Sequence, residues 1–186
     1  MGELNQHDLS RFDCSVFIET GTGKAVGTSH AVSYPQFKQL HTIEKIPLLH
    51  EYSKSILRDP RLTFHLGDSV EVLKSLLLSI PTEHRILYWL DAHFPGADYQ
   101  LAPYTFDDDS MPLKRELSVI LERRSIQNDS FIIDDLQLYE DGPFQFFNPN
   151  LPIKKSGIGF LERIFDSTHR IQRDYRHQGF LIVTPV

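Results

Sequence analysis

VFIETGTGKAVGTSHA, residues 16–31, runs from a short apolar stretch into an acid and then into a loop that contains three glycines. Apolar residues that end at Glu19 and lead into Gly21, Gly23 and Gly27 are typical of a buried strand followed by a tight turn. Glycine has no side chain, so a ligand can approach the backbone of such a loop closely. The stretch therefore predicts an α/β fold with a ligand site at the end of its first strand.

Two familiar phosphate-binding loops do not fit this stretch. A P-loop needs a glycine five residues before its Gly-Lys pair and a Ser or Thr after it, but Ile18 and Ala25 occupy those positions around Lys24. A dinucleotide loop has the spacing G-x-G-x-x-G, and Gly27 lies one residue too far along. The carboxylate of Glu19 is also a poor neighbour for a pyrophosphate.

A ligand with a cationic end and no phosphate suits Glu19 better. S-adenosylmethionine has an ammonium group, a sulfonium, a ribose and an adenine. Glu44 ends the second apolar stretch, where an acid can accept hydrogen bonds from both ribose hydroxyls. Asp68, followed by Ser69, ends the third and is placed to meet the adenine amino group. The alternatives are that Asp68 only caps a helix and that Glu44 is a solvated strand end.

Short apolar runs alternate with helix-period segments along the whole chain, which predicts βαβ units and a parallel sheet covered by helices on both faces. The last two predicted strands have only a tight turn between them, so they pair antiparallel. Strands are predicted at 14–19, 39–44, 61–66, 85–91, 130–135, 169–175 and 179–185, and helices after Pro47, Asp68 and Pro112 and near 157–166. Two long segments without periodicity, 94–112 and 139–157, follow strands on the ligand side of the sheet and are expected to be functional.

The composition is that of one globular domain spanning 1–186, with 40% apolar and 24% charged residues. No apolar window of membrane-spanning length occurs, so no membrane partner is expected. The net charge is −6 and the basic residues form only short clusters, which favours a small-molecule partner over nucleic acid. The single cysteine, Cys14, excludes an internal disulfide and a cysteine metal site. Together with a polar N-terminal segment, it indicates the cytoplasm.

A second set of candidate residues ends the fourth and fifth predicted strands. Asp91 and His93 follow the fourth, and Asp134 and Asp135 follow the fifth. These strands are neighbours in a doubly wound sheet, so the three carboxylates repel one another unless a cation or a shared proton lies among them. Oxygen ligands favour Mg²⁺, Ca²⁺ or Mn²⁺, and a histidine favours Mn²⁺, Fe²⁺ or Zn²⁺. The alternative is that these acids only cap the helices that follow.

Over residues 14–186 the chain resembles the class I S-adenosylmethionine-dependent methyltransferases. Their first motif corresponds to Glu19-Thr20-Gly21-Thr22-Gly23, with Ala25 where the family often has a third glycine. The terminal hairpin matches the family's sheet, a mostly parallel seven-stranded sheet in the order 3-2-1-4-5-7-6. The resemblance implies a donor site made by Glu19, Gly21, Thr22, Gly23, Glu44, Asp68, Ser69 and Asp91.

The acids of the second set are similar to those of metal-dependent small-molecule O-methyltransferases, such as catechol O-methyltransferase and the macrolide-sugar methyltransferases. This resemblance implies that Asp91 and Asp134 bind Mg²⁺ or Mn²⁺ and that Asp135 is a third ligand or orients one. His93 is then a ligand or the general base. The lysine that the catechol-type enzymes carry after the fourth strand is absent from 94–99. The implied reaction is methylation of a hydroxyl on a small sugar-like or polyhydroxylated acceptor.

Other hypotheses remain at this point. The chain is short before its first strand, where many relatives carry helices that cover the acceptor. The site is then open, or closed by a homodimer, or the domain is a non-catalytic module that binds a partner. A nicotinamide-dependent oxidoreductase would require glycine at position 26. Tyr99 and the acidic run 107–109 are interpreted as a lid and as solvated surface.

Overall fold

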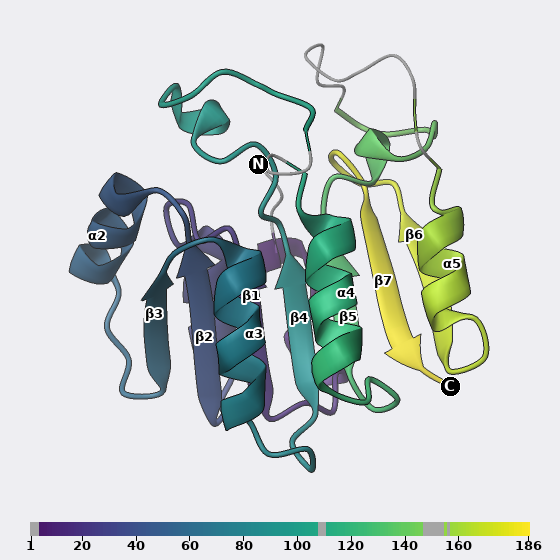
Figure 1. Cartoon of the computed structure of the whole chain (residues 1–186), viewed down its shortest axis with the longest axis horizontal. Coiled ribbons are helices and arrows are strands. Elements are labelled where there is room, and N and C mark those ends of the chain that lie inside the picture. Colours follow the sequence, from purple (N-terminus) through teal and green to yellow (C-terminus); the bar gives the residue numbers. More distant parts are fainter. Residues whose placement is uncertain (1–3, 108–110, 147–154, 156) are drawn as a thin grey trace.

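The computed structural model describes residues 4–107, 111–146, 155 and 157–186, and the strands lie within these ranges. The strands are β1 (Val16–Thr20), β2 (Gln39–Glu44), β3 (Leu62–Leu66), β4 (Ile86–Leu90), β5 (Ser130–Ile133), β6 (His169–Asp174) and β7 (Phe180–Pro185). They form one sheet in the order β3-β2-β1-β4-β5-β7-β6 (Figure 1). The first five are parallel, and β7 pairs antiparallel with both β5 and β6. The predicted strand order and terminal hairpin are confirmed.

Helices cover both faces of this sheet. The α-helices are α1 (Val26–Val32), α2 (Pro47–Ile56), α3 (Ser69–Ser79), α4 (Leu113–Arg123) and α5 (Gly159–Phe165). Short 3₁₀ turns are η1 (Leu4–Gln6), η2 (Leu9–Arg11), η3 (Ala97–Tyr99) and η4 (Leu136–Leu138). Helices α3, α4 and α5 pack on one face, whereas α1 and the N-terminal turns pack on the other. Figure 1 shows α3 and α4 side by side in front of the central strands.

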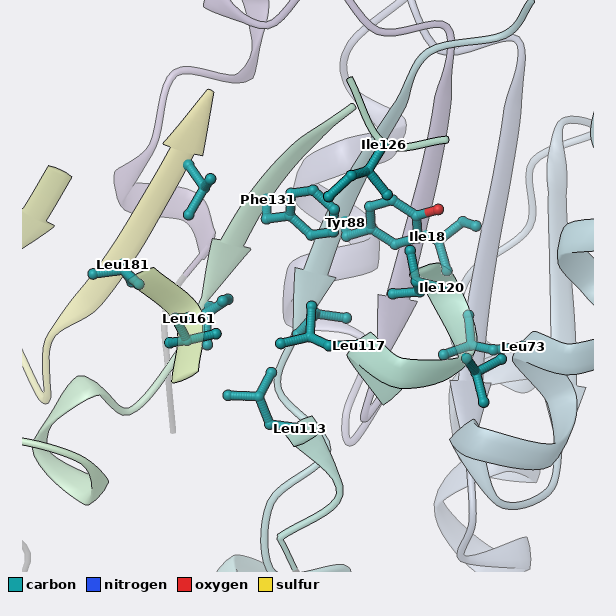
Figure 2. Packing of buried hydrophobic residues seen from close by; sticks show 14 of the residues in the cluster. Ile18, Leu73, Tyr88, Leu113, Leu117, Ile120, Ile126, Phe131, Leu161 and Leu181 are labelled. Carbon is teal, nitrogen blue, oxygen red and sulfur yellow. The ribbon is translucent and has the colours of Figure 1, made fainter. Parts of the chain in front are cut away.

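The larger core lies between the sheet and helices α3 and α4. The ring of Tyr88 stacks on that of Phe131, with centroids 4.7 Å apart and planes 10° apart. Leu117 and Ile120 of α4 and Leu73 of α3 close over the sheet beside them (Figure 2). Truncating such a buried ring to alanine removes about 3–5 kcal/mol of stability. This layer fixes β4 and β5 as neighbours, and the candidate acids lie at their ends.

Helix α1 was not among the helices that we predicted from periodicity. The sequence VGTSHAV contains a glycine and β-branched residues, which are weak helix formers. Tertiary contacts override that weakness, because Thr28 and Ala31 are both fully buried. The chain enters the helix through Ala25, which has a left-handed backbone with φ of 60°. The helix is therefore specified by what it packs against.

The carboxyl ends of β1 to β5 meet at one edge of the sheet, where the two long loops also begin (Figure 1). The backbone ladder continues one residue beyond the central strands. The amide of Asp91 donates to the carbonyl of Thr20 at 3.1 Å, and that of Asp134 donates to Leu90 at 3.1 Å. The backbone positions of both aspartates are thus fixed by the sheet. No helix in the described part of the chain is long and apolar enough to cross a membrane.

Candidate functional site

A cleft opens at this edge of the sheet, with about 690 Å³ of empty space when its open mouth is included. The cleft is lined by the glycine loop after β1, the ends of β2 and β3, the loop after β4 and the turn after β5, among other segments. Its polar lining includes Glu44, Asp68, Ser69, Asp91, His93 and Asp135. These six and two of the glycines, all predicted site residues, therefore meet around one cavity.

Gly21 and Gly23 line the cleft, and both need to be glycine because of protein neighbours. Gly21 has φ of +84°, and a Cβ on it would overlap the backbone carbonyl of Asp91. Gly23 has φ of +51°, and its Cβ would overlap the hydroxyl of Tyr99. Positive φ values already disfavour side chains at these positions. The glycine loop is thus pressed against the end of β4 and the turn that follows it.

Glu19 lies fully inside the protein at the end of β1, on the side of the sheet that α1 covers. Its carboxylate accepts a hydrogen bond from the hydroxyl of Thr42 at 2.5 Å and another from that of Thr28. Burial raises the pKa of Glu19 to about 7. A Cβ on Gly27 would overlap Oε1 of Glu19. The third glycine therefore makes room for this carboxylate, which explains why its spacing fits no phosphate loop.

Thr22, the remaining loop residue of the predicted donor site, is buried below the cleft. Its hydroxyl lies 2.5 Å from that of Thr42, which also contacts Glu19. Thr22 thus belongs to the hydroxyl network that holds Glu19, and its side chain does not line the main cleft. A smaller adjoining cavity has both Thr22 and Glu19 in its wall.

Glu44 ties the glycine loop to the end of β2. Its Oε2 accepts a hydrogen bond from the amide of Gly23 at 2.8 Å, and its Oε1 accepts one from Ile46 at 2.8 Å. Burial raises the pKa of this carboxyl, although the two amides act in the opposite direction. Glu44 lines the cleft while making these bonds, so its position is fixed before any ligand arrives.

Asp68 has the helix-capping role that the sequence left open. Its Oδ1 accepts a hydrogen bond from the amide of Val70 at 3.0 Å, which caps α3. Its other oxygen pairs with Nζ of Lys45 at 3.1 Å. Asp68 and Ser69 also line the cleft. Capping and ligand contact are compatible here, because the cap places the carboxylate at the cleft wall.

The second set of residues converges at the ends of β4 and β5. The imidazole of His93 is 4% exposed, and its Nδ1 lies 3.6 Å from Oδ1 of Asp91 and 3.8 Å from Oδ2 of Asp135. Asp134 is fully buried at the position that continues the β4–β5 register. Asp135 has a left-handed backbone with φ of 53°, an uncommon conformation that turns the chain away after β5. The structure thus brings His93 near Asp91 and Asp135, with Asp134 beside them at the end of β5.

Several buried polar atoms of this cluster lack the hydrogen-bond partners that such atoms normally have. Both oxygens of Asp134, Oδ1 of Asp135 and Nδ1 of His93 have no hydrogen-bond partner among the described residues. Burial raises the pKa of Asp91 well above its usual range, and the charge of Asp135 adds to the effect. Burial and the charge of Asp91 do the same to Asp134. The cluster binds a proton or a cation more readily than isolated carboxylates do.

This donor set fits a divalent cation chemically, since it offers buried carboxylate oxygens and one imidazole nitrogen without other partners. Within the ranges that the structure describes, however, no group of three His, Cys, Asp or Glu side chains is already arranged around a point where an ion would bind. A small rearrangement of the side chains would be needed to hold one.

Sequence reasoning missed two further groups at the site. Tyr99, from the turn after β4, contacts the glycine loop. Its hydroxyl accepts a hydrogen bond from the amide of Lys24 at 3.2 Å. We expected it only as a lid. Of the acidic run 107–109, which we expected to be solvated surface, Asp107 lies in the described part of the segment 94–112, whereas Asp108 and Asp109 lie outside the described residues. No pattern in the sequence pointed to contact between Tyr99 and the glycines, because 75 residues separate it from Lys24.

Glu116 is the second group. It is 1% exposed on α4, and its Oε1 has no hydrogen-bond partner in the described part of the chain. Burial raises its pKa, while the hydroxyl of Ser69 and the nearby His93 oppose the rise. The sequence did contain a signal, since Glu116 lies within the apolar stripe that Leu113 begins. A charged residue at such a position is usually buried for a reason.

No protein-family profile matches the chain, and no curated protein sequence matches it. Solved structures do match. A protein from Staphylococcus aureus assigned as a caffeoyl-CoA O-methyltransferase has a TM-score of 0.62 at 14% identity, over 93% of this chain and 77% of that one. The O-methyltransferase TomG of Streptomyces achromogenes, solved with S-adenosylmethionine, has a TM-score of 0.55 at 15% identity, over 94% and 74%.

Human methyltransferase-like protein 13, solved with S-adenosylhomocysteine, has a TM-score of 0.58 at 12% identity, over 93% of this chain and 72% of that one. Identities this low show a shared fold and leave chemistry to be argued from the site. The strand order, including the antiparallel β7 between β5 and β6, is the order that the resemblance in the sequence implied. The chain has the fold of the class I S-adenosylmethionine-dependent methyltransferases.

Proposed function

We propose that this protein transfers a methyl group from S-adenosylmethionine to a hydroxyl oxygen of a small, sugar-like or polyhydroxylated acceptor, assisted by Mg²⁺ or Mn²⁺. One observation carries the proposal. The unpartnered acids and the histidine at the ends of β4 and β5 lie in or beside the wall of the same cleft as the glycine loop. A donor held by the loop and an acceptor held by the acids would therefore meet in one cavity.

On the donor side, the chain supplies fixed polar groups around an otherwise open cleft. The carboxylate of Glu44 faces the cleft from β2 and suits a ribose, while Asp68 and Ser69 face it from the start of α3 and suit an adenine. Glu19, on the far side of the glycine loop, suits a cation. S-adenosylmethionine supplies a methyl group already activated by its positive sulfur. The protein needs mainly to hold donor and acceptor in line.

On the acceptor side, the reaction requires removal of a proton from the hydroxyl. His93 is the candidate base, because its Nδ1 points among the acids without a hydrogen-bond partner in the described residues. Asp91, Asp134 and Asp135 would hold the divalent ion, which would lower the pKa of a bound hydroxyl. The net charge of −6 supports a small molecule over a nucleic acid as the acceptor. A free, buried Cys14 supports a reducing compartment such as the cytoplasm.

Isothermal titration calorimetry with S-adenosylmethionine and S-adenosylhomocysteine tests the donor half. Binding in the micromolar range is expected, and no heat from either compound at millimolar concentration would end the proposal. The acceptor half is tested by titrating Mn²⁺ and then by supplying labelled donor with a panel of polyhydroxylated compounds. Donor binding without methylation of any acceptor, with or without Mn²⁺, would instead favour a non-catalytic module that retains the donor site.

A further inference from the structure

A second, much smaller space shares part of its wall with the main cleft at the glycine loop. The two share Gly21, Asp91 and Tyr99 in their walls. The small cavity continues away from the cleft, between the loop and the start of α1, and reaches the buried carboxylate of Glu19. The glycine loop is therefore a common wall of the two spaces.

The polar groups of the main cleft decide which end of the donor enters the small cavity. Glu44 and Asp68 lie at the ends of β2 and β3, and both suit the adenosine part. The amino-acid part is then directed the other way, across Gly21 and into the small cavity. That part of S-adenosylmethionine is a zwitterion, with an ammonium and a carboxylate on one carbon.

The small cavity has groups that match both charges. Glu19 and Asp91 are acids that can face the ammonium. Lys24 is the one basic residue among the described residues that line it. The side chain of Lys24 is exposed, and its Nζ lies 5.3 Å from the centre of the Tyr99 ring. Within the described parts of the chain, that ammonium forms no ion pair.

Tyr99 keeps Lys24 at the mouth of the small cavity. The phenol hydroxyl accepts a hydrogen bond from the backbone amide of Lys24, and the ring makes a cation–π contact with the ammonium of the same residue. The loop that contains Tyr99 turns back through Gly96 and Gln100, which both have left-handed backbones. A cation with no anionic partner among the described residues thus lies beside a cavity whose other charged groups are acids.

We infer that Lys24 binds the carboxylate of the methyl donor and makes the site selective for S-adenosylmethionine over its decarboxylated form. This inference rests on the proposed function, because it concerns how the same donor is recognised. Tyr99 acts as a positioning residue that holds the lysine. Without Lys24 the charged groups that line the cavity would all be acids, which would suit a donor whose end carries an ammonium alone.

The test compares two ligands that differ only in the carboxylate. S-adenosylhomocysteine carries the ammonium and the carboxylate, whereas S-adenosyl-3-thiopropylamine carries the ammonium alone. Calorimetry on the wild type should show about tenfold tighter binding of S-adenosylhomocysteine, the size expected for a charge-assisted contact at a partly exposed site. Lys24→Met keeps the aliphatic stem and removes the charge. It should remove this preference while leaving the affinity for the amine within about twofold.

Lys45→Met is the matched control, because Lys45 lines the main cleft beside Asp68 at the other end of the donor. It is expected to change both affinities by the same factor and to leave their ratio unchanged. Tyr99→Phe should reduce the ratio only partly, since the ring contact with Lys24 remains. Thermal melts confirm that each variant is folded before its affinities are compared.

Each outcome decides between the two claims. If the wild type binds neither ligand, the proposed function fails and this inference fails with it. If the wild type binds both ligands equally well, or if Lys24→Met leaves the preference intact, the inference on Lys24 is wrong while the donor site stands. Loss of the preference in Lys45→Met as well would assign it to general electrostatics around the cleft, which also overturns the inference.

Discussion

The two ends of strand β5 each carry a buried aspartate, and the two differ in almost every contact. Asp129 precedes the strand and is 1% exposed. Its oxygens accept hydrogen bonds from Nε of Arg124 at 3.0 Å and from the amide of Ile86 at 2.9 Å. Asp134 follows the strand and is fully buried, yet neither of its oxygens has a hydrogen-bond partner among the described residues.

The difference separates structural acids from functional ones. A buried carboxylate that is fully paired helps to hold the fold, since removing its partner leaves an uncompensated charge. A buried carboxylate without partners is unfavourable on its own and is retained where a ligand completes it. The carboxylate oxygens of Asp129, before β5, are thus both paired, whereas those of Asp134, after β5, are not. Substitutions at the two ends should have opposite consequences.

Asp134→Asn should have the largest effect, a loss of activity without a loss of stability. The side chain keeps its shape but loses the charge needed to bind a cation, so methyl transfer should slow about a thousandfold, or by about 4 kcal/mol. The free energy of unfolding should stay equal or rise, because a repelling charge is removed from beside Asp91. Turnover is measured as release of S-adenosylhomocysteine, and stability by urea denaturation.

Donor affinity and Mn²⁺ affinity are the controls for this variant. S-adenosylhomocysteine should bind the Asn variant about as well as the wild type, whereas Mn²⁺ binding should be strongly weakened. A variant that methylates at the wild-type rate would show that Asp134 has no part in the chemistry. A marked fall in stability would show that it is a structural acid like Asp129.

Asp129→Asn should produce the reverse pattern. Removing this charge leaves the guanidinium of Arg124 buried with its partner neutralised, and the side chain of Arg124 is only 3% exposed. The free energy of unfolding should fall by about 4 kcal/mol, as for other broken buried ion pairs. Folded protein should still bind S-adenosylhomocysteine normally, as measured by calorimetry below the melting temperature. Stability within about 1 kcal/mol of the wild type would contradict the structural role.

The fold was predictable from local pattern because most of its elements are regular. The seven apolar runs became seven strands within two residues of the predicted ends, and β2 matched at both ends. The helices with a clear apolar stripe or a Pro start, such as α2 and α4, were also found. Helix α1 was missed because its residues become helical only through contact with the sheet. Intrinsic helix propensity does not take such tertiary contacts into account.

The site was predictable to the level of which acids meet, and not of how they are partnered. Parallel strands bring their carboxyl ends to one edge, so Asp91 and Asp134 had to be neighbours once the strand order was known. Whether a carboxylate is satisfied depends on residues far away in sequence. Thr42 binds Glu19 from 23 residues away, and Tyr99 contacts Lys24 from 75. Such pairings follow from the assembled fold alone.

The raised pKa of Glu19, on the donor side of the site, should make the free energy of unfolding depend on pH. Its pKa is raised from 4.5 to about 7, so the folded state holds a proton that the unfolded state has released between these values. Stability from this group is therefore complete below pH 4.5 and is lost as the pH rises to 7. The difference in unfolding free energy between wild type and Glu19→Gln should shift by about 3 kcal/mol across this range.

Donor binding should respond to the same proton in the opposite direction. The ionised carboxylate attracts the donor's ammonium, so affinity for S-adenosylhomocysteine should fall as the pH drops below 7. Glu19→Gln should flatten this profile, because it has no charge to lose. Calorimetry between pH 6 and pH 8 measures both profiles. Parallel pH profiles for the two proteins would show that another group governs donor binding.

Gly27→Ala should have the smallest effect, and it tests whether the third glycine serves Glu19. The added methyl group would overlap Oε1 of Glu19 and lie 3.4 Å from Nε1 of Trp89, so the carboxylate must move. Overpacking of this kind should lower the free energy of unfolding by about 2 kcal/mol and weaken donor binding. Gly159→Ala is the control, since its Cβ would meet only Arg163 at 3.7 Å. There alanine should raise stability by about 0.5 kcal/mol through reduced freedom of the unfolded chain. If both variants gained stability equally, Gly27 would be an ordinary helix residue and the carboxylate of Glu19 would not need the space.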